Sequence, residues 1–326
     1  MRNVAYLCNW GDSSAELLVF LARQTPGGRG AWNDFQGVAS PSEADYLVVL
    51  EDLPTTFKRS DIDFQRTIFL PREPLAVRAR KNYESFRAPL AFTHEDIHQA
   101  AVWRVMLTFE ELASPEYFAK SRPLSSVTSA ANVTPGHRKR AQFLRDFARQ
   151  HPGMLDVYGY GWKDELGTSY KGELGNRFAK VTDFAALCKL AGLKDYRYSL
   201  AFENSQQRNY FSEKLVDCWL AWSMPLYWGC PNLSEFFPSD AFHEIDPSRD
   251  DCTRLVADIV AQPVSPRQIE AMREARNLIL HRYNVWPTVD EIVGGRRPAR
   301  RPAPTFFRRM VDLVKGPRVR HEAPPR

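Results

Sequence analysis

The chain has 326 residues, of which 44% are hydrophobic and 25% charged, so it can form two domains with separate cores. This composition excludes an intrinsically disordered chain, and no apolar run approaches the roughly 20 residues that cross a bilayer. The five cysteines are scattered and lack zinc-ligand spacing, and the start lacks the apolar core of a signal peptide. These features predict a cytoplasmic protein with reduced thiols.

Strand and helix patterns alternate over residues 1–120, which predicts an α/β domain. We expect strands at 3–8, 44–50 and 66–70, a helix at 13–23 and a long, Gly-rich surface loop at 25–38. Asn9, Trp10 and Asp12 directly follow the first strand, where a loop faces substrate in such domains. We therefore expect these three residues on the acceptor side of a site.

Glu73 is the candidate catalytic residue of this half. It follows the apolar strand 66–70, and the flanking Pro71 and Pro74 hold its carboxylate at the strand's carboxyl end. A half-buried carboxylate there suits a general base that takes a proton from a hydroxyl. The alternative is a turn glutamate that pairs with Arg72 or Arg78.

Two short motifs suggest metal sites, and both have simpler readings. The segment 94–98 fits H-E-x-x-H, in which His94 and His98 would hold zinc and Glu95 would activate water. A solvated helix start capped by Thr93 fits it as well. The segment 61–63 has the form D-x-D, which is also typical of an acidic turn. We expect no metal site.

We expect a linker at residues 115–123, and the alternating strand and helix patterns predict a second α/β domain at residues 121–290. It opens with a strand at 124–130, a basic helix at 136–150 and a strand at 155–158. The run 198–229 then reads as a strand, a polar loop, an amphipathic helix capped by Asn209 or Ser212, and a strand at 224–228.

Glu213 and Lys214 lie in the first turn of that predicted helix. Ligands of open parallel sheets bind at the carboxyl ends of strands, where the next helices begin. There, Glu213 can accept hydrogen bonds from ribose hydroxyls, while Lys214 and the helix dipole favour phosphate. The alternative is that Glu213 only complements the helix dipole and that Lys214 is a solvated surface residue.

Three blocks in this region resemble the donor-site signature of the family 10 glycosyltransferases, the α-1,3/4-fucosyltransferases of bacterial type. They read YRYSLAFENS at 196–205, NYFSEK at 209–214 and MPLYWG at 224–229. The family has roughly Y-x-x-x-L-x-F-E-N-S, D-Y-x-T-E-K and V/I-P-x-x-x-G. Asn209, Ser212 and Met224 are mild departures from it.

The resemblance implies the GT-B architecture, in which two Rossmann-like domains face each other across a cleft. It implies inverting transfer of L-fucose from GDP-β-L-fucose to a glycan hydroxyl, with Glu73 as the base. The alternatives are a GT-B transferase for a different GDP-sugar and a non-catalytic relative that binds glycans or membranes. No cofactor is implied. The donor-binding candidates are Arg140, with Arg138 as the alternative register, and Glu203, Asn204, Tyr210, Glu213 and Lys214. Expected acceptors are O3 of GlcNAc or glucose in a surface polysaccharide or lipopolysaccharide.

The last predicted region is a basic tail at 291–326. Residues 296–320 carry a net charge of +8, with Asp312 the only acidic residue among them. An amphipathic helix at 306–315 would suit peripheral contact with the inner face of the cell membrane. A disordered basic tail is the alternative, and we expect no nucleic-acid binding, because no stacking aromatics are interleaved with the basic residues.

Overall fold

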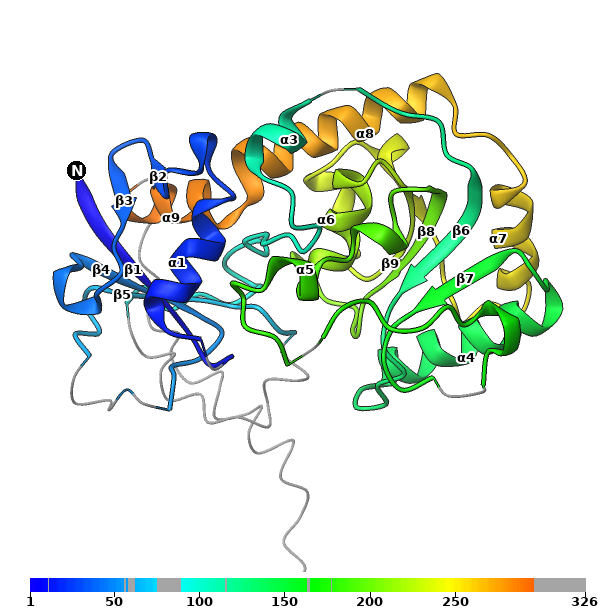
Figure 1. Ribbon diagram of the computed structural model, residues 1–326, viewed down its shortest axis with the longest axis horizontal. Helices are drawn as coiled ribbons and strands as arrows, with labels where there is room; N and C mark the ends of the chain where they lie inside the picture. The colour runs from blue at the N-terminus through cyan, green and yellow to red at the C-terminus, as the bar shows by residue number, and fades with distance from the viewer. Residues whose placement is uncertain are drawn as a thin grey trace, which may run out of the picture.

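The computed structural model describes residues 1–10, 12–55, 57, 62–74, 89–114, 116–162, 165–176 and 178–295. Within these ranges the chain forms two α/β domains, each built on one sheet (Figure 1). The predicted tail segment 296–320, Arg78 and Asp61 lie outside the described residues. None of the described helices combines the length and hydropathy that crossing a bilayer requires.

The first sheet has the strand order β2-β3-β1-β4-β5. Its strands β1, β3, β4 and β5 are parallel, and only β2 runs antiparallel to its neighbour. The strands are β1 Arg2–Cys8, β2 Ala31–Trp32, β3 Phe35–Gly37, β4 Tyr46–Leu50 and β5 Thr67–Leu70. The prediction of β1, β4 and β5 is confirmed to within two residues.

Local sequence explains the start of this domain. The β1 residues from Val4 to Cys8 are all buried, as expected for a parallel strand covered on both faces. Helix α1 (Ser14–Ala22) begins at Ser13, whose side chain accepts a hydrogen bond from Glu16 N–H in a capping box.

The prediction of a loop at 25–38 is wrong, because this segment contains β2 and β3. Val38 N–H donates to the carbonyl of Val4, and Phe35 is 1% exposed. The glycines hid the strands in the sequence, since short edge strands with glycine lack a clear alternating pattern.

The second sheet has the order β10-β9-β8-β6-β7, and all its strands are parallel. Its strands are β6 Arg122–Val127, β7 Leu155–Tyr158, β8 Tyr196–Phe202, β9 Met224–Trp228 and β10 His243–Glu244. The described helices from α3 to α8 are α3 Phe109–Ala113, α4 Pro135–Gln150, α5 Phe184–Leu187, α6 Glu213–Leu220, α7 Cys252–Val260 and α8 Pro266–Leu278. The predicted strand-helix-strand unit of 198–229 is confirmed as β8-α6-β9, with Ser212 as the N-cap.

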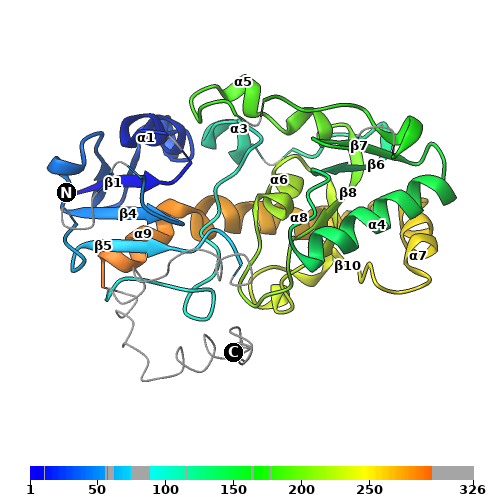
Figure 2. The same ribbon diagram turned by 90° about the horizontal axis from the view of Figure 1, so that it is seen from below.

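The chain crosses between the domains twice, and the two crossings bond to each other. Ala101 N–H donates to the carbonyl of Tyr283, and Val285 N–H donates to the carbonyl of Ala101. After the second crossing, α9 (Val285–Val293) covers the first sheet (Figure 2). Trp286 stacks on Phe35 in the core of the first domain.

Residues 285–293 therefore pack with the first domain, and not with the second domain and the tail as their place in the sequence predicts. Sequence order alone gave no sign of this return. The apolar face of α9 could pack against either domain. It packs against the first domain because the chain crosses back to that domain after Tyr283.

The connection from β7 to β8 also contacts the first domain. Val181 is buried in the first domain's core, and its N–H donates to Asp12 Oδ1 at 3.0 Å. Lys180 Nζ forms an ion pair with Glu16 on α1. This connection spans both domains, so it borders the cleft between them.

Candidate active site

Two adjoining cavities lie between the domains, where strands of both sheets end. The first has a volume of about 350 Å³, and most of its lining residues lie on or next to β6, α4, α5 and α6 of the second domain. We call it the donor-side cavity. The second surrounds about 380 Å³ and is lined by Asn9, Trp10, Glu51, Arg72, Glu73, Arg104 and Glu213. We call it the acceptor-side cavity. Both are lined by Glu73 and Glu213, so these two carboxylates stand where the cavities meet.

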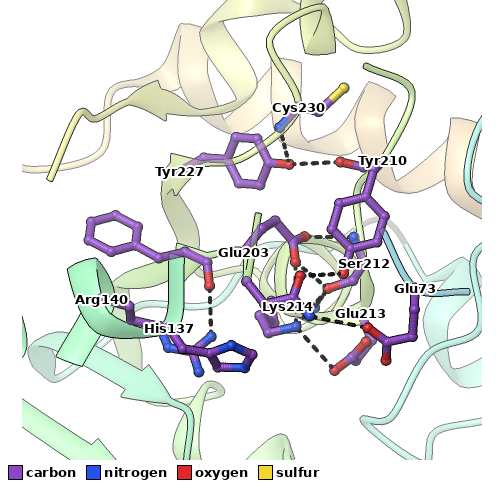
Figure 3. Close-up of polar contacts among 12 residues, drawn as sticks. Glu73, His137, Arg140, Glu203, Tyr210, Ser212, Glu213, Lys214, Tyr227 and Cys230 are labelled. Carbon is purple, nitrogen blue, oxygen red and sulfur yellow. Dashed lines mark hydrogen bonds and ion pairs between the residues drawn. The ribbon is translucent and has the colours of Figure 1, made fainter. Parts of the chain in front are cut away.

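A buried carboxylate organises the start of α6 (Figure 3). Glu203, which is fully buried at the end of β8, accepts hydrogen bonds from Ser212 N–H and Ser212 Oγ, both at 2.7 Å. Lys214 Nζ lies 3.4 Å from Glu203 Oε2 and 3.1 Å from Ser212 Oγ. Glu203 therefore fixes both the first turn of α6 and the ammonium of Lys214.

Close packing in this region depends on Gly229, at the end of β9. A Cβ at this position would overlap with the Cγ of Glu203 and the hydroxyl of Tyr227. Glycine is therefore needed for β9 to pass the buried carboxylate.

Glu213 is placed between two lysines. Its Oε1 lies 3.0 Å from Lys189 Nζ and 3.8 Å from Lys214 Nζ. Burial by itself raises the pKa of Glu213, but the two lysines hold it well below its ordinary value. Burial lowers the pKa of Lys214, and Glu213 and Glu203 more than offset this, so Lys214 stays charged. No sequence motif points to Lys189, which lies in the irregular connection between β7 and β8.

The structure separates the two candidate arginines of α4. Arg140 is 3% exposed, lines the donor-side cavity and donates to the carbonyls of Phe202 and Ser129 at 3.1 and 3.3 Å. Burial lowers its pKa to about 10, which leaves it charged at neutral pH. Arg138 is exposed and is not among the described residues that line this cavity.

Glu73 contacts the second domain across the cleft. Its Oε2 accepts a hydrogen bond from Asn204 Nδ2 at 3.1 Å, and Asn204 Oδ1 accepts one from the hydroxyl of Tyr210, also at 3.1 Å. Burial raises the pKa of Glu73, while Lys214 and the bond from Asn204 lower it less. A half-buried carboxylate with a raised pKa is thus aligned by an amide of the opposite domain.

Two predicted donor residues lie behind the cavity surface. Tyr210 is 1% exposed and Glu203 is fully buried, and neither is among the residues that line the donor-side cavity. Both reach the cavity through a neighbour, Tyr210 through Asn204 and Glu203 through Lys214.

The first domain contributes fewer groups. Trp10 is 37% exposed on the acceptor-side cavity, and the guanidinium of Arg104 lies 5.5 Å from its ring. Asn9 lines the same cavity. Asp12 instead binds the backbone of Val181, so the structure gives it a role in joining the domains. Arg104 and Glu51 also line this cavity, and no sequence motif points to either of them, although Glu51 directly follows an apolar strand.

The helix start predicted at 94–98 is wrong. The segment forms turns rather than a helix, and His94 and His98 are only 1% and 5% exposed. The ring of His94 packs edge-on against Tyr210, and that of His98 stacks on Phe211. The segment therefore packs one domain against the other, and the helix that H-E-x-x-H requires is not formed.

Residues 119–257 match the model of glycosyltransferase family 10 (fucosyltransferase), C-terminal part. A fucosyltransferase-like protein of Arabidopsis thaliana is 41% identical over 83 residues, which are 25% of this chain and 15% of that protein. The α-(1,3)-fucosyltransferase FucT of Helicobacter pylori is 30% identical over 76 residues, or 23% of this chain and 14% of that protein. The matches thus span about a seventh of these relatives' lengths.

Among solved structures, an α-glucosyltransferase in complex with UDP is similar at a TM-score of 0.53 and 8% identity. The similarity covers 90% of this chain and 99% of that chain. At this identity the likeness concerns the fold alone, and it confirms the predicted GT-B architecture. Residues 119–257 of this chain are thus similar to the C-terminal part of the family 10 glycosyltransferases, the fucosyltransferases.

Proposed function

We propose that this protein transfers L-fucose from GDP-β-L-fucose to a hydroxyl of a glycan, with inversion to the α-linkage. The observation that carries the proposal is the bond from Asn204 to Glu73, which joins a candidate base of the first domain to the family signature of the second. An inverting transferase needs one general base placed between the donor and the acceptor, and the Glu73 carboxylate lies where the two cavities meet.

The donor-side cavity offers groups for a nucleoside diphosphate. Arg140 and Lys214 would bind the diphosphate, because both stay charged and both line this cavity. Glu213 would accept hydrogen bonds from the ribose, since its low pKa keeps it ionised. These cations and the start of α6 would stabilise the charge that develops on the leaving diphosphate, so we propose that no metal ion is needed.

The reaction then follows from the position of Glu73. An acceptor hydroxyl in the acceptor-side cavity attacks the anomeric carbon and passes its proton to Glu73. The bond from that carbon to the diphosphate oxygen breaks, and GDP leaves with the electron pair. Asn204 would hold the carboxylate toward the acceptor hydroxyl during this step.

For the acceptor, we propose O3 of a GlcNAc or glucose unit in a surface polysaccharide or lipopolysaccharide. Trp10 lines the acceptor-side cavity and could stack on a sugar ring. We also propose that the protein acts in the cytoplasm and contacts the inner face of the cell membrane through residues 296–320. Such a location would bring it close to a membrane-linked acceptor.

Calorimetric titration tests the donor assignment. We expect GDP to bind at micromolar concentration, GDP-fucose to bind more tightly than GDP-mannose, and Lys214→Ala to remove most of the binding. Preference for GDP-mannose would favour a GT-B transferase for another GDP-sugar. Binding of GDP-fucose without turnover would favour a non-catalytic relative, and no binding of any guanine nucleotide would contradict both.

A further inference from the structure

Glu51 binds the backbone beside the candidate base. It directly follows β4, is 7% exposed, and lines the acceptor-side cavity together with Glu73. Its Oε2 accepts hydrogen bonds from two consecutive N–H groups of the neighbouring strand end, those of Arg72 at 2.8 Å and Glu73 at 2.9 Å. We call this contact the Glu51 clamp.

The backbone of Glu51 is held in an unusual conformation. Its φ is +75°, in the left-handed region that residues with a Cβ rarely adopt. Its own N–H donates to the carbonyl of Leu70, which ties the end of β4 to the end of β5. Strained backbone persists where surrounding contacts fix it and is enriched at functional sites.

Resting on the function proposed above, we propose that Glu51 is a positioning residue for the base. The clamp fixes the backbone from which the Glu73 side chain extends, while Asn204 fixes the carboxylate itself. The base is thus held at both ends, by its own domain at the backbone and by the opposite domain at the side chain. A displacement of about 1 Å of such a group can cost on the order of 10²-fold in rate.

The charge of Glu51 has a second effect. Burial is the main cause that raises the pKa of Glu73, and the negative charges of Glu51 and Glu213 add to it. Lys214 and the hydrogen bond from Asn204 act in the opposite direction. Tyr210 and Arg72 also interact electrostatically with Glu73. Removing the Glu51 charge alone therefore lowers the pKa of Glu73.

Two variants separate the clamp from the charge. Glu51→Gln keeps the shape and an acceptor oxygen but removes the charge, so we expect the Glu73 signal in ¹³C NMR to titrate at a lower pH than in the wild type. Glu51→Gly removes the clamp yet suits a φ of +75°, so the fold is retained while kcat falls about 10²-fold. In both, the affinity for GDP stays unchanged, because Glu51 does not line the donor-side cavity.

The exposed Glu43→Gln of the same domain is the control, and Glu73→Gln identifies the Glu73 signal. Two results together would overturn the proposal. They are an unchanged titration of the Glu73 signal in Glu51→Gln and a kcat of Glu51→Gly within about twofold of wild type. If Glu51→Gly does not fold, kcat of Glu51→Gln decides, because a neutral oxygen holds the two N–H groups more weakly than a carboxylate does, and a kcat within about twofold of wild type would then overturn the proposal. A wild type that transfers no fucose contradicts the proposed function, whereas the shift of the Glu73 signal in Glu51→Gln still tests whether the charge of Glu51 acts on Glu73.

Discussion

The two faces of the cleft are built differently. On the second domain, the donor-side groups are bonded to one another, as in the set of Glu203, Ser212 and Lys214. On the first domain, Glu73 and Trp10 extend from loops at strand ends, and Glu73 makes its side-chain bond to the opposite domain.

This difference has a physical reason. A diphosphate is the same in every donor molecule, so a rigid, preorganised set of charges is an advantage. Acceptor glycans differ, and loops can change without disturbing the sheet that supports them. The donor-side face should therefore determine nucleotide affinity, and the acceptor-side face should determine turnover.

The largest effect that tests this division concerns Glu73. Glu73→Gln removes the proton acceptor but keeps an oxygen for the bond from Asn204, so we expect kcat to fall about 10³-fold. Calorimetry should give an unchanged affinity for GDP. Turnover at the wild-type rate would remove Glu73 from the mechanism.

Lys214→Ala tests the opposite face. The change removes a charged hydrogen-bond donor and leaves Glu203 without its ammonium partner, so GDP should bind about 10²-fold more weakly. The exposed Lys194→Ala is a matched control for which we expect no change. Equal GDP affinity in the two variants would place the diphosphate elsewhere.

A pair of conservative changes on α4 should have a smaller effect. Arg140→Lys keeps the charge but loses the planar group that reaches two carbonyls, so GDP affinity should fall about 10-fold. Arg138→Lys changes an exposed side chain and should leave affinity within about twofold. The reverse result would mean that the register of the family motif on α4 begins at Arg138.

The smallest effect is a shift in pH dependence. A base must be ionised to accept a proton, and burial raises the pKa of Glu73 above the ordinary value of 4.5. Transfer should therefore decline as the pH falls through this raised pKa, at a higher pH than for an exposed glutamate. A rate that stays constant down to the ordinary glutamate pKa would show that Glu73 is not the base.

Much of the second domain could be predicted from sequence because its signals are local. Ser212 caps a helix whose apolar face is visible in the spacing of Leu215, Cys218 and Trp219. The strand Met224–Trp228 is an unbroken apolar run that ends at a glycine. Neighbouring residues in the sequence suffice to form such elements.

The features that could not be predicted depend on contacts between distant residues. Lys189 meets Glu213 only because the connection after β7 returns to the cleft. His94 is buried against Tyr210 of the other domain. The residues next to His94 in the sequence do not reveal this contact, and by themselves they predict a solvated helix start. The clamp of Glu51 on Glu73 joins residues whose strands pair in space.

The most direct test of the account is to follow GDP-β-L-fucose by NMR in the presence of candidate glycan acceptors. For the wild type, we expect release of GDP together with an α-linked fucoside, and for Glu73→Gln we expect intact donor that is still bound. A folded wild type that binds GDP-fucose but never forms a fucoside, or forms one equally well in Glu73→Gln, would contradict it.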